Sequence, residues 1–557
     1  VLYISERTGA VDIVMDPSDS NILYAAAWQL ISGEESGIYK TSDGGNNWEK
    51  LTSGLPSGKT GRAGLDISVK NPDVVYAFID NHAPGTGENE IAGGEVYRSD
   101  NKGETWRKVN EDDLYGTFTI YGWKFCDIRI SPDNEDEIYI LGNRGYHSTD
   151  GGKTYKRFGE RIIRMFDTKG IIMHLDHHEI WIDPDNTDRI ILGNDGGLFM
   201  SYDRADSWLH INNLPIGEFY TVSTDMDIPY NIYGGTQDNA SLYGPGTHDM
   251  KNAVTDPWEH VFLDRWTGGD GFVTLRDPTD RDIVYYEHQH GSMYRMDITG
   301  SVMTGGPSTT RIRPRAKEGE RRWRFGWYMP FIISKYDPYT LYAGGNKLLK
   351  STDRGDNWTA ISPDLAYEGK GQWEKVPFGT ITMISESPLQ KGLLFAGTEG
   401  GSIYITRDDG ENLNEISAGL PEKWVSRIIA SKYDPRIVYS SFTGYREDDF
   451  GKYLFMSEDQ GETWSPISGN LPPESINVIT EDPEYDQILY VGTDLGVYVT
   501  LDRGKKWYSL CCNLPTTPVH DMTVHPRDLE LIIGTHGRSV FVIDIKPVHR
   551  YYEEAKR

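Results

Sequence analysis

The chain has 557 residues, of which 37% are hydrophobic and 12% aromatic, which excludes a largely disordered protein and exceeds the usual size of a single-core domain. Its 84 acidic and 56 basic residues give a formal net charge of −28, which would repel a phosphate backbone and argues against nucleic-acid binding. No apolar run reaches the roughly 18 residues needed to cross a bilayer, so we expect no membrane span.

The first residues, VLYISERTG, read as a closing strand followed by a turn, and the next segment, AVDIVM, reads as the inner strand of a new unit. A strand with an unpaired edge is an aggregation hazard. We therefore expect an upstream fragment or a second subunit to pair with this strand, unless the C-terminal strand VFVIDI returns to it. No charged and apolar leader is visible here. We expect such a leader upstream, removed from a protein that is extracellular, periplasmic or on the cell surface.

An acidic turn, KTSDGGNNWEKL over residues 40–51, recurs along the chain. Its pattern has Ser or Thr first, an acidic or amide residue third, Gly or Ala fifth, and an aromatic residue or Leu eighth. The third positions are Asp43, Asn101, Asp150, Asp203, Asp353, Asp408, Asp459 and Asp502. If two units between Asp203 and Asp353 lack the turn, Asp43 and Asp502 are nine steps apart, an average of about 51 residues per step. A period of this length is typical of β-propeller blades.

A second repeated signal has the same phase. A proline-containing turn is followed by an alternating apolar strand, as in DPSDSNILYAAA from Asp16 and DPEYDQILYVGT from Asp482. Together the two signals define eleven units of short strands. Alternation with period two, without long helical periodicity, predicts an all-β fold.

The composition of the acidic turn indicates a structural role. The third-position carboxylate can accept hydrogen bonds from backbone N–H groups of its own turn, and the fifth-position Gly can take a positive φ at no steric cost. The following Trp, as at Trp106 or Trp358, is expected to face inward between neighbouring sheets. We interpret these residues as structural and not as catalytic groups.

The turn resembles the Asp box of the BNR repeat, which occurs in sialidases, sortilin ectodomains and two-propeller endoglucanases that cleave xyloglucan. The segments LDHHEIWIDP, GNDGGLFMSYD, GGTQDNASLYGP, GGDGFVTLRDPTD and IIGTHGRSVFVIDI look most like secreted bacterial BNR-repeat proteins described as sortilin-like or glycosyl hydrolase-related. The resemblance covers nearly the whole chain. It implies a multi-bladed β-propeller.

The resemblance implies two tandem seven-bladed propellers. Residues 1–170 would form a first propeller that is incomplete in this chain, and residues 171–515 would form the seven-bladed second one. Residues 516–557 would return to the first propeller. The alternative is a single ten-bladed propeller of the sortilin type.

The segment MHLDHHEIW contains a candidate metal site. Alternation would place His174, Asp176 and His178 on one face of a strand, and imidazole with carboxylate suits a divalent metal ion. The alternative is that these groups bond to one another and to loops at a channel mouth. No cofactor is required on either hypothesis.

Carboxylates at Gly-rich strand ends form the second candidate. An inverting glycosidase needs an acid and a base on opposite sides of the cleaved bond, and in the similar endoglucanases two Asp residues from different propellers face each other. Asp195 and Asp494 match that local pattern best and are the predicted catalytic pair. Asp238 and Asp270 are predicted to bind ligand. The alternative is that each Asp only caps a turn.

The third candidate is the basic, aromatic segment TTRIRPRAKEGERRWRFGWYMP, which includes Arg311 and Arg313. Its predicted ligand-binding residues are Arg321, Arg322, Trp323, Trp327 and Tyr328. Guanidinium groups pair with carboxylate or sulfate, and aromatic faces stack on sugars or peptides. The alternative is an internal contact with the acidic surface of the same protein.

Two functions remain open on the sequence. The favoured one is a secreted or surface-attached scaffold that binds glycan or protein partners, because the repeats are evident and no complete catalytic set is. The alternative is a polysaccharide-cleaving hydrolase with paired Asp residues in a groove between propellers.

Overall fold

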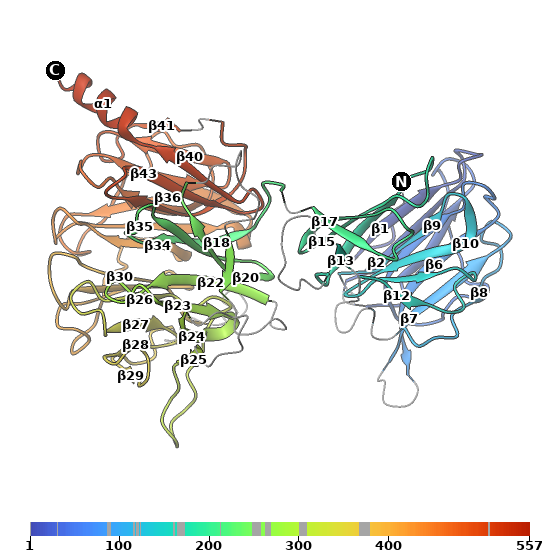
Figure 1. Cartoon of the computed structure of the whole chain (residues 1–557), viewed down its shortest axis with the longest axis horizontal. Helices are drawn as coiled ribbons and strands as arrows, with labels where there is room; N and C mark the ends of the chain where they lie inside the picture. Colours follow the sequence, from blue (N-terminus) through green and yellow to red (C-terminus); the bar gives the residue numbers. More distant parts are fainter. Residues whose placement is uncertain are drawn as a thin grey trace. The chain divides into compact units, whose positions relative to one another are not determined.

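The structure is a computed structural model that describes residues 2–30, 32–85, 91–114, 117, 122, 124–159, 162–163, 173–211, 213–247, 258–261, 269–299, 309–366, 379–510 and 513–557. It consists of two compact units, Val1–Leu214 and Pro215–Arg557 (Figure 1). Both units are built from small, mostly antiparallel sheets.

The first unit contains four sheets of neighbouring strands. Their successive inner strands β1, β5, β9 and β14 contact one another in chain order. The strands are β1 (Thr8–Met15), β2 (Leu23–Gln29), β3 (Gly37–Thr41), β4 (Glu49–Lys50), β5 (Thr60–Ile67), β6 (Val75–Pro84), β7 (Ile91–Ser99), β8 (Arg107–Lys108), β9 (Asp127–Ser131), β10 (Asn134–Leu141), β11 (Tyr146–Ser148), β12 (Lys156–Arg157), β13 (Ile162–Ile163), β14 (His177–Ile182), β15 (Ile190–Asn194), β16 (Gly197–Ser201) and β17 (Trp208–Ile211).

The second unit consists of groups of four strands in chain order, except that its last sheet, β42–β44, has three. A parallel pair between β20 and β22 joins its first two groups into one sheet. The strands are β18 (Phe219–Thr224), β19 (Asn231–Thr236), β20 (Asn239–Pro245), β21 (Glu259–Val261), β22 (Gly269–Arg276), β23 (Ile283–His288), β24 (Ser292–Asp297), β25 (Thr309–Arg311), β26 (Phe331–Ile333), β27 (Leu341–Gly344), β28 (Leu348–Ser351), β29 (Thr359–Ala360), β30 (Ile381–Glu386), β31 (Leu394–Thr398), β32 (Ile403–Thr406), β33 (Asn414–Glu415), β34 (Trp424–Ala430), β35 (Val438–Gly444), β36 (Asp449–Ser457), β37 (Ser465–Pro466), β38 (Ile476–Glu481), β39 (Leu489–Thr493), β40 (Gly496–Thr500), β41 (Trp507–Ser509), β42 (Val519–His525), β43 (Glu530–Thr535) and β44 (Val540–Asp544). Short 3-10 turns occur at Gln289–Gly291 and Tyr445–Glu447, and the helix α1 spans Lys546–Ala555.

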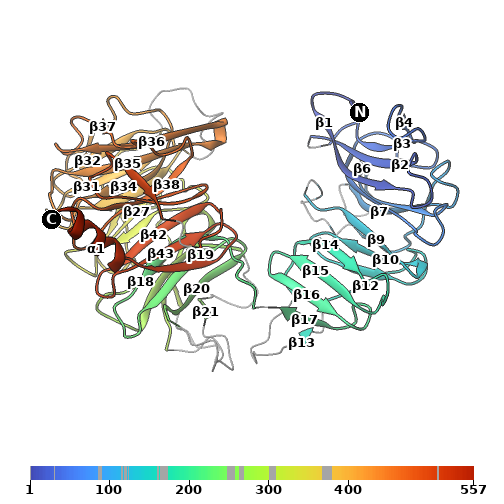
Figure 2. The ribbon, with the colours of Figure 1, turned by 90° about the horizontal axis from the view of Figure 1, so that it is seen from above.

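The sheets of the second unit close into a ring. The last sheet, β42–β44, contacts β18 of the first, and the two lie side by side in Figure 2. The backbone N–H of Val222 donates to Asp521 Oδ2 over 2.9 Å, and the Tyr230 hydroxyl donates to Glu530 Oε2 over 2.5 Å. The predicted all-β, multi-bladed propeller is confirmed.

These contacts correct the predicted domain boundaries. The division between the units falls after Leu214 and not after residue 170, and residues 516–557 pack within the second unit and not on a first propeller. The reason is that β42 and β43 pack against β18 and the segment before β19, at the start of their own unit, through hydrogen bonds between residues about 300 positions apart. The number of blades in the whole chain stays a prediction.

The chain start differs from the predicted closing strand. The first strand is β1, which includes the segment AVDIVM, while residues 2–7 form no strand and Ser5 makes only an isolated bridge to Thr8. β1 pairs with β2 in an antiparallel register with a bulge between Ala10 and Asp12. Among the described residues, no helix is long and apolar enough to cross a membrane.

Each acidic turn connects the third and fourth strands of a blade, and we call these turns Asp boxes. In the box at Asp353, the Ser351 hydroxyl donates to Asp353 Oδ1 over 2.7 Å, and the Asn357 N–H and side-chain amide donate to the two carboxylate oxygens over 2.9 and 2.7 Å. The N–H of Gly355 in turn donates to the Ser351 hydroxyl over 2.9 Å. The same first-to-third hydroxyl bond is present in the boxes at Asp43, Asn101, Asp150, Asp203, Asp408, Asp459 and Asp502.

The fourth residue of each box also has a positive φ, a feature that the sequence analysis missed. It is most often not Gly: Lys102, Arg204, Arg354, Asp409, Gln460 and Arg503 all lie between 54° and 61°. A left-handed backbone conformation costs free energy for Lys, Arg and Gln, although Asp adopts it more readily. The hydrogen bonds of the box therefore hold the backbone in this conformation.

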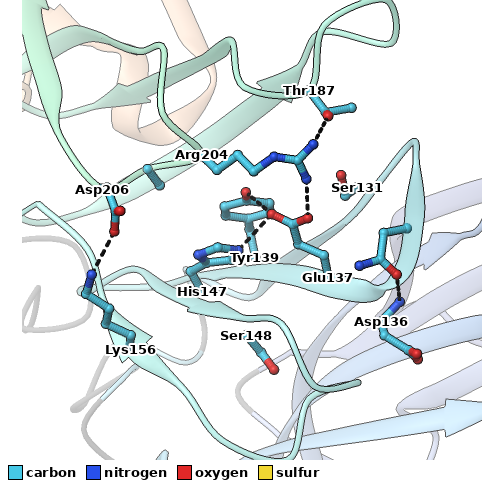
Figure 3. A network of polar contacts seen from close by, with 12 residues as sticks. Ser131, Asp136, Glu137, Tyr139, His147, Ser148, Lys156, Thr187, Arg204 and Asp206 are labelled. Carbon is cyan, nitrogen blue, oxygen red and sulfur yellow. Dashed lines mark hydrogen bonds and ion pairs between the residues drawn. The ribbon is translucent and has the colours of Figure 1, made fainter.

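The strained fourth residue contacts the preceding blade. Arg204 donates to Glu137 Oε2 in β10 of the preceding blade and to Thr187 Oγ1 in its own blade, both over 2.5 Å (Figure 3). Glu137 is buried and also accepts from the Tyr139 hydroxyl, and His147 Nε2 lies 3.0 Å away. Burial alone would raise the pKa of Glu137, but these bonds and the Arg204 charge keep that pKa below its usual value.

The box aromatic residues pack between blades, as predicted from the sequence. Trp208 is fully buried in a cluster with Tyr139, Ile180 and Phe199. Trp358 Nε1 donates to the Ile312 carbonyl of the preceding blade over 2.8 Å. The other box tryptophans are buried at Trp106 and Trp507 and partly exposed at Trp48 and Trp464.

The box at Asp353 provides a stability test. Replacing Asp353 by Ala removes three hydrogen bonds that fix the hairpin, so we expect a loss of about 1–2 kcal/mol in the free energy of unfolding of the second unit. Thr352 is exposed in the same turn, and Thr352→Ala should change that free energy by less than about 0.5 kcal/mol. Chemical denaturation followed by circular dichroism measures both. Equal effects of the two variants would contradict the structural role of the carboxylate.

Candidate functional site

The two ends of each sheet carry different turns. Neighbouring strands are antiparallel, so the turn between the second and third strands and the start of the first strand lie at one end, and the Asp box lies at the other. We call the first end the 2–3 face. Asp195 lies between β15 and β16, Asp238 between β19 and β20, and Asp494 between β39 and β40. The candidate carboxylates therefore lie on the 2–3 faces, away from the Asp boxes.

The 2–3 face of the first unit brings His178 and Asp195 together. His178 Nε2 lies 2.5 Å from Asp195 Oδ1, with 40% of the His178 side chain and 24% of the Asp195 side chain exposed. A bulge between His177 and Glu179 turns His178 outward at the start of β14. Asp195 is thus an accessible carboxylate with an imidazole partner.

Asp176 lies directly before this strand in a left-handed conformation, with a φ of 65°. Its Oδ1 accepts a hydrogen bond from Asn143 Nδ2 over 2.6 Å. Burial raises the pKa of Asp176, and the nearby charge of Asp195 raises it further, against the lowering effect of Asn143. The charge of Asp195 therefore helps to keep a proton on Asp176.

The expected alternation of His174, Asp176 and His178 along one strand is not observed. β14 begins only at His177, and His174 Nδ1 lies 3.0 Å from the Leu175 carbonyl. Burial lowers the pKa of His177 to about 3, so this imidazole is neutral. Within the part of the chain that the structure describes, no three His, Cys, Asp or Glu side chains form a group that could hold a metal ion.

The 2–3 face of the second unit gathers side chains around Asp270, in β22. Asp270 is 2% exposed. Trp327 Nε1 donates to its Oδ2 over 2.6 Å, the Tyr220 hydroxyl lies 3.0 Å from the same oxygen, and the N–H of Asp238 donates to Oδ1 over 3.0 Å. We call Tyr220, Asp238, Asp270 and Trp327 the Asp270 cluster. Three predicted ligand-binding residues are thereby in direct contact.

Trp327 combines this buried bond with an accessible ring, since 44% of the residue is exposed. His290 packs edge-on against it, with ring centroids 5.1 Å apart. His288 Nδ1 lies 3.1 Å from the Asp270 carbonyl, and burial lowers the pKa of His288. The cluster therefore holds an exposed indole ring in a fixed orientation beside a buried carboxylate.

Other predicted site residues lie apart from these two groups. Asp494 accepts a hydrogen bond from Asn477 Nδ2 over 2.9 Å in the β38–β41 sheet. Arg321 and Arg322 are exposed on the loop after β25, whereas Trp323 and Tyr328 pack on the core cluster that contains Met293 and Phe331. Asp195 and Asp494 belong to different units, so their predicted pairing stays a prediction.

Sequence reasoning missed three participants. Asn143, Tyr220 and His288 have no motif that distinguishes them from many similar residues in propeller strands. Strand register places such residues next to the carboxylates. For example, Gly271 pairs with His288, which puts His288 beside Asp270.

Comparisons with known proteins agree with the repeat pattern. A family model described as sortilin, neurotensin receptor 3, matches residues 452–550, which include the Asp boxes at Asp459 and Asp502. This match and the repeated boxes confirm the resemblance to Asp-box β-propeller proteins.

A curated relative, a probable oligoxyloglucan-reducing end-specific xyloglucanase of Neosartorya fischeri, is 22% identical over 561 aligned residues. The alignment covers 90% of this chain and 65% of the relative, so the chain spans less than two thirds of that protein.

Solved structures with a similar fold include a GH74 enzyme of Niastella koreensis and a GH74 xyloglucanase of Xanthomonas campestris. The first is 12% identical and the second 13%. Each alignment covers 96% of this chain, and 90% and 98% of the two proteins, with TM-scores of 0.32 and 0.29. Scores this low do not show a shared arrangement of the whole chain.

The Asp270 cluster provides a second stability test. The donors around Asp270 bond to both of its carboxylate oxygens, and Asp270→Asn would leave only one oxygen that can accept. We therefore expect this substitution to lower the free energy of unfolding by roughly 2 kcal/mol. Asp494→Asn, at a carboxylate with one amide donor, should cost less. Because Trp327 donates to Asp270, Trp327→Phe and Asp270→Asn together should cost less than the sum of the two. If the losses in free energy of unfolding of the two single variants added up to that of the double variant, the contact between Trp327 and Asp270 would be contradicted.

Proposed function

We propose that the chain is a glycoside hydrolase that cleaves a polysaccharide, with carboxyl groups on the 2–3 faces at its active site. The alignment with a xyloglucanase over 90% of the chain supports this function over the non-catalytic scaffold that the sequence alone favoured. The observation that carries the proposal is that two carboxyl groups adjoin one another: the N–H of Asp195 donates to the Asp176 carbonyl over 3.3 Å, the pKa of Asp176 is raised by burial, and Asp195 is partly exposed beside His178.

Hydrolysis of a glycosidic bond needs a carboxylic acid that protonates the leaving oxygen and a carboxylate that activates water or attacks the sugar. Asp176 meets the first requirement, because burial and Asp195 favour its protonated form. Asp195 meets the second, because it is accessible and bonded to His178, which fixes its orientation. In this proposal His178 is a positioning residue.

The Asp270 cluster would be a separate sugar-binding site on the second unit. An exposed indole face stacks on the apolar face of a pyranose ring, and the fixed orientation of Trp327 reduces the entropy lost on binding. Asp270 accepts bonds from Trp327 and Tyr220 and is almost fully buried, so we assign it to holding the ring and not to proton transfer.

The alternative catalytic pair, Asp195 with Asp494, differs in the second carboxylate. Asp195 belongs to the first unit and Asp494 to the second. Asp494→Asn therefore separates the two assignments: it should abolish cleavage only if Asp494 replaces Asp176 in the reaction.

Activity measurements test the proposal. Xyloglucan, mixed-linkage glucan, arabinoxylan and an acidic pectin are incubated with the protein, and new reducing ends are counted. We expect cleavage of at least one polymer. Asp176→Asn and Asp195→Asn should each lower kcat by roughly 10²-fold or more, the scale of a lost general acid or base. Asp206→Asn is a matched control, since Asp206 lies in an Asp box and pairs with the exposed Lys156.

The pH dependence provides a sharper readout. Asp176 must be protonated to act as the acid, so kcat/KM should fall as the pH rises through its raised pKa. In Asp176→Asn this alkaline decline should disappear from the residual activity. Binding without cleavage of every polymer would instead support the scaffold, and full activity of Asp176→Asn would remove Asp176 from the reaction.

A further inference from the structure

Three arginines near the Asp270 cluster form a group of like charges. Arg311 ends β25, and Arg313 and Arg315 follow at alternate positions, so that an extended backbone directs all three toward one side. The proline at position 314 favours an extended conformation at Arg313. Arg311 and Arg315 are exposed, and Arg313 is half-buried.

The three guanidinium groups are close enough to influence one another. Burial, together with the charges of Arg311 and Arg315, lowers the pKa of Arg313. No ion pair joins any of the three to an acidic residue within the described ranges, although the chain has a net charge of −28. Carboxylates elsewhere on this protein are commonly paired with arginine, as Asp364 is with Arg324. The three guanidinium groups can therefore pair with an anion from a ligand.

Contacts connect this group to the Asp270 cluster. Arg313 Nη2 donates to the His290 carbonyl over 2.9 Å, and its guanidinium lies over the Phe325 ring. The N–H of His290 donates to the Trp327 carbonyl over 3.1 Å, and the His290 ring packs on the Trp327 indole. A ligand stacked on Trp327 would therefore have its neighbouring groups near Arg313.

We propose that Arg311, Arg313 and Arg315 bind carboxylate or sulfate groups of an acidic polysaccharide next to the Asp270 cluster. Guanidinium groups bind such planar or multi-oxygen anions through paired, charge-assisted hydrogen bonds. The inference rests on the proposed function, which it deepens by assigning an acidic substrate class. A polysaccharide suits the site better than an acidic peptide because the adjoining surface is the exposed indole of Trp327, which stacks on sugar rings.

Binding measurements test the inference without relying on cleavage. The Asp195→Asn protein is titrated with polygalacturonate, dextran sulfate and neutral xyloglucan by affinity electrophoresis and calorimetry at low salt. The test variant Arg311→Gln/Arg315→Gln removes two exposed charges. The control Lys317→Gln/Lys391→Gln removes two charges from exposed residues, one on the same loop and one in the turn after β30.

We expect the arginine double variant to bind at least one acidic polymer about tenfold more weakly, the scale of one or two lost charge-assisted bonds. Its affinity for neutral xyloglucan should be unchanged, and the lysine control should lose less than twofold for every polymer. Thermal unfolding at the wild-type temperature shows that both variants are folded. Arg313→Gln should weaken binding to the acidic polymer as well, because it removes the central guanidinium that the double variant retains.

Several results would overturn the inference. One is that the protein binds neither acidic polymer. Another is that the two double variants weaken binding equally, which would mean that only overall charge matters. A third is that polyglutamate competes as well as the acidic polysaccharides, which would indicate an acidic protein partner. If cleavage of a neutral polymer persists in any of these cases, the proposed function stands and only the acidic substrate class fails.

Discussion

The hydrogen bonds inside the Asp box are the interaction on which the rest of this structure depends. A Ser or Thr hydroxyl donates to the third-position side chain, and that side chain accepts the N–H of a residue four positions later, as in the box at Asp459. These bonds lie within the turn, so much of the hairpin is specified locally. They hold two consecutive residues, Gln460 and Gly461, at positive φ values, and the N–H of Gln460 also donates to the Arg436 carbonyl over 2.8 Å.

The fourth residue of an Asp box, which has a positive φ, can also connect its blade to the preceding one. Lys102 bonds to the buried Asp16, Arg204 to the buried Glu137, and Arg354 lies 3.2 Å from the buried Asp277. In each case a cation on one hairpin pairs with a carboxylate in the preceding sheet. Breaking such a pair would leave a buried charge without its partner, so these contacts select one arrangement of neighbouring sheets. The opposite end of each sheet carries no such requirement, and its turns are free to differ.

That freedom explains why the candidate sites differ so much between the two units. On the first unit, the turn with Asp195 and the segment with Asp176 combine two partly exposed carboxyl groups with an imidazole. On the second unit, the corresponding end combines a buried carboxylate with an exposed aromatic ring. The first arrangement suits proton transfer, and the second suits binding and orientation of a sugar chain.

The sequence by itself determined the repeat, the phase of the blades and the role of the Asp boxes, because these depend on residues within about eight positions of one another. It also indicated Asp195 and Asp270, as carboxylates at Gly-rich strand ends. Only the tertiary structure decided that Trp327 reaches Asp270, that Asn143 bonds to Asp176, and that β42 closes on β18. These contacts join residues 57, 33 and about 300 positions apart. A repeat with nearly identical strands gives no local signal for which distant strands become neighbours, so ring closure and strand register had to be seen in three dimensions.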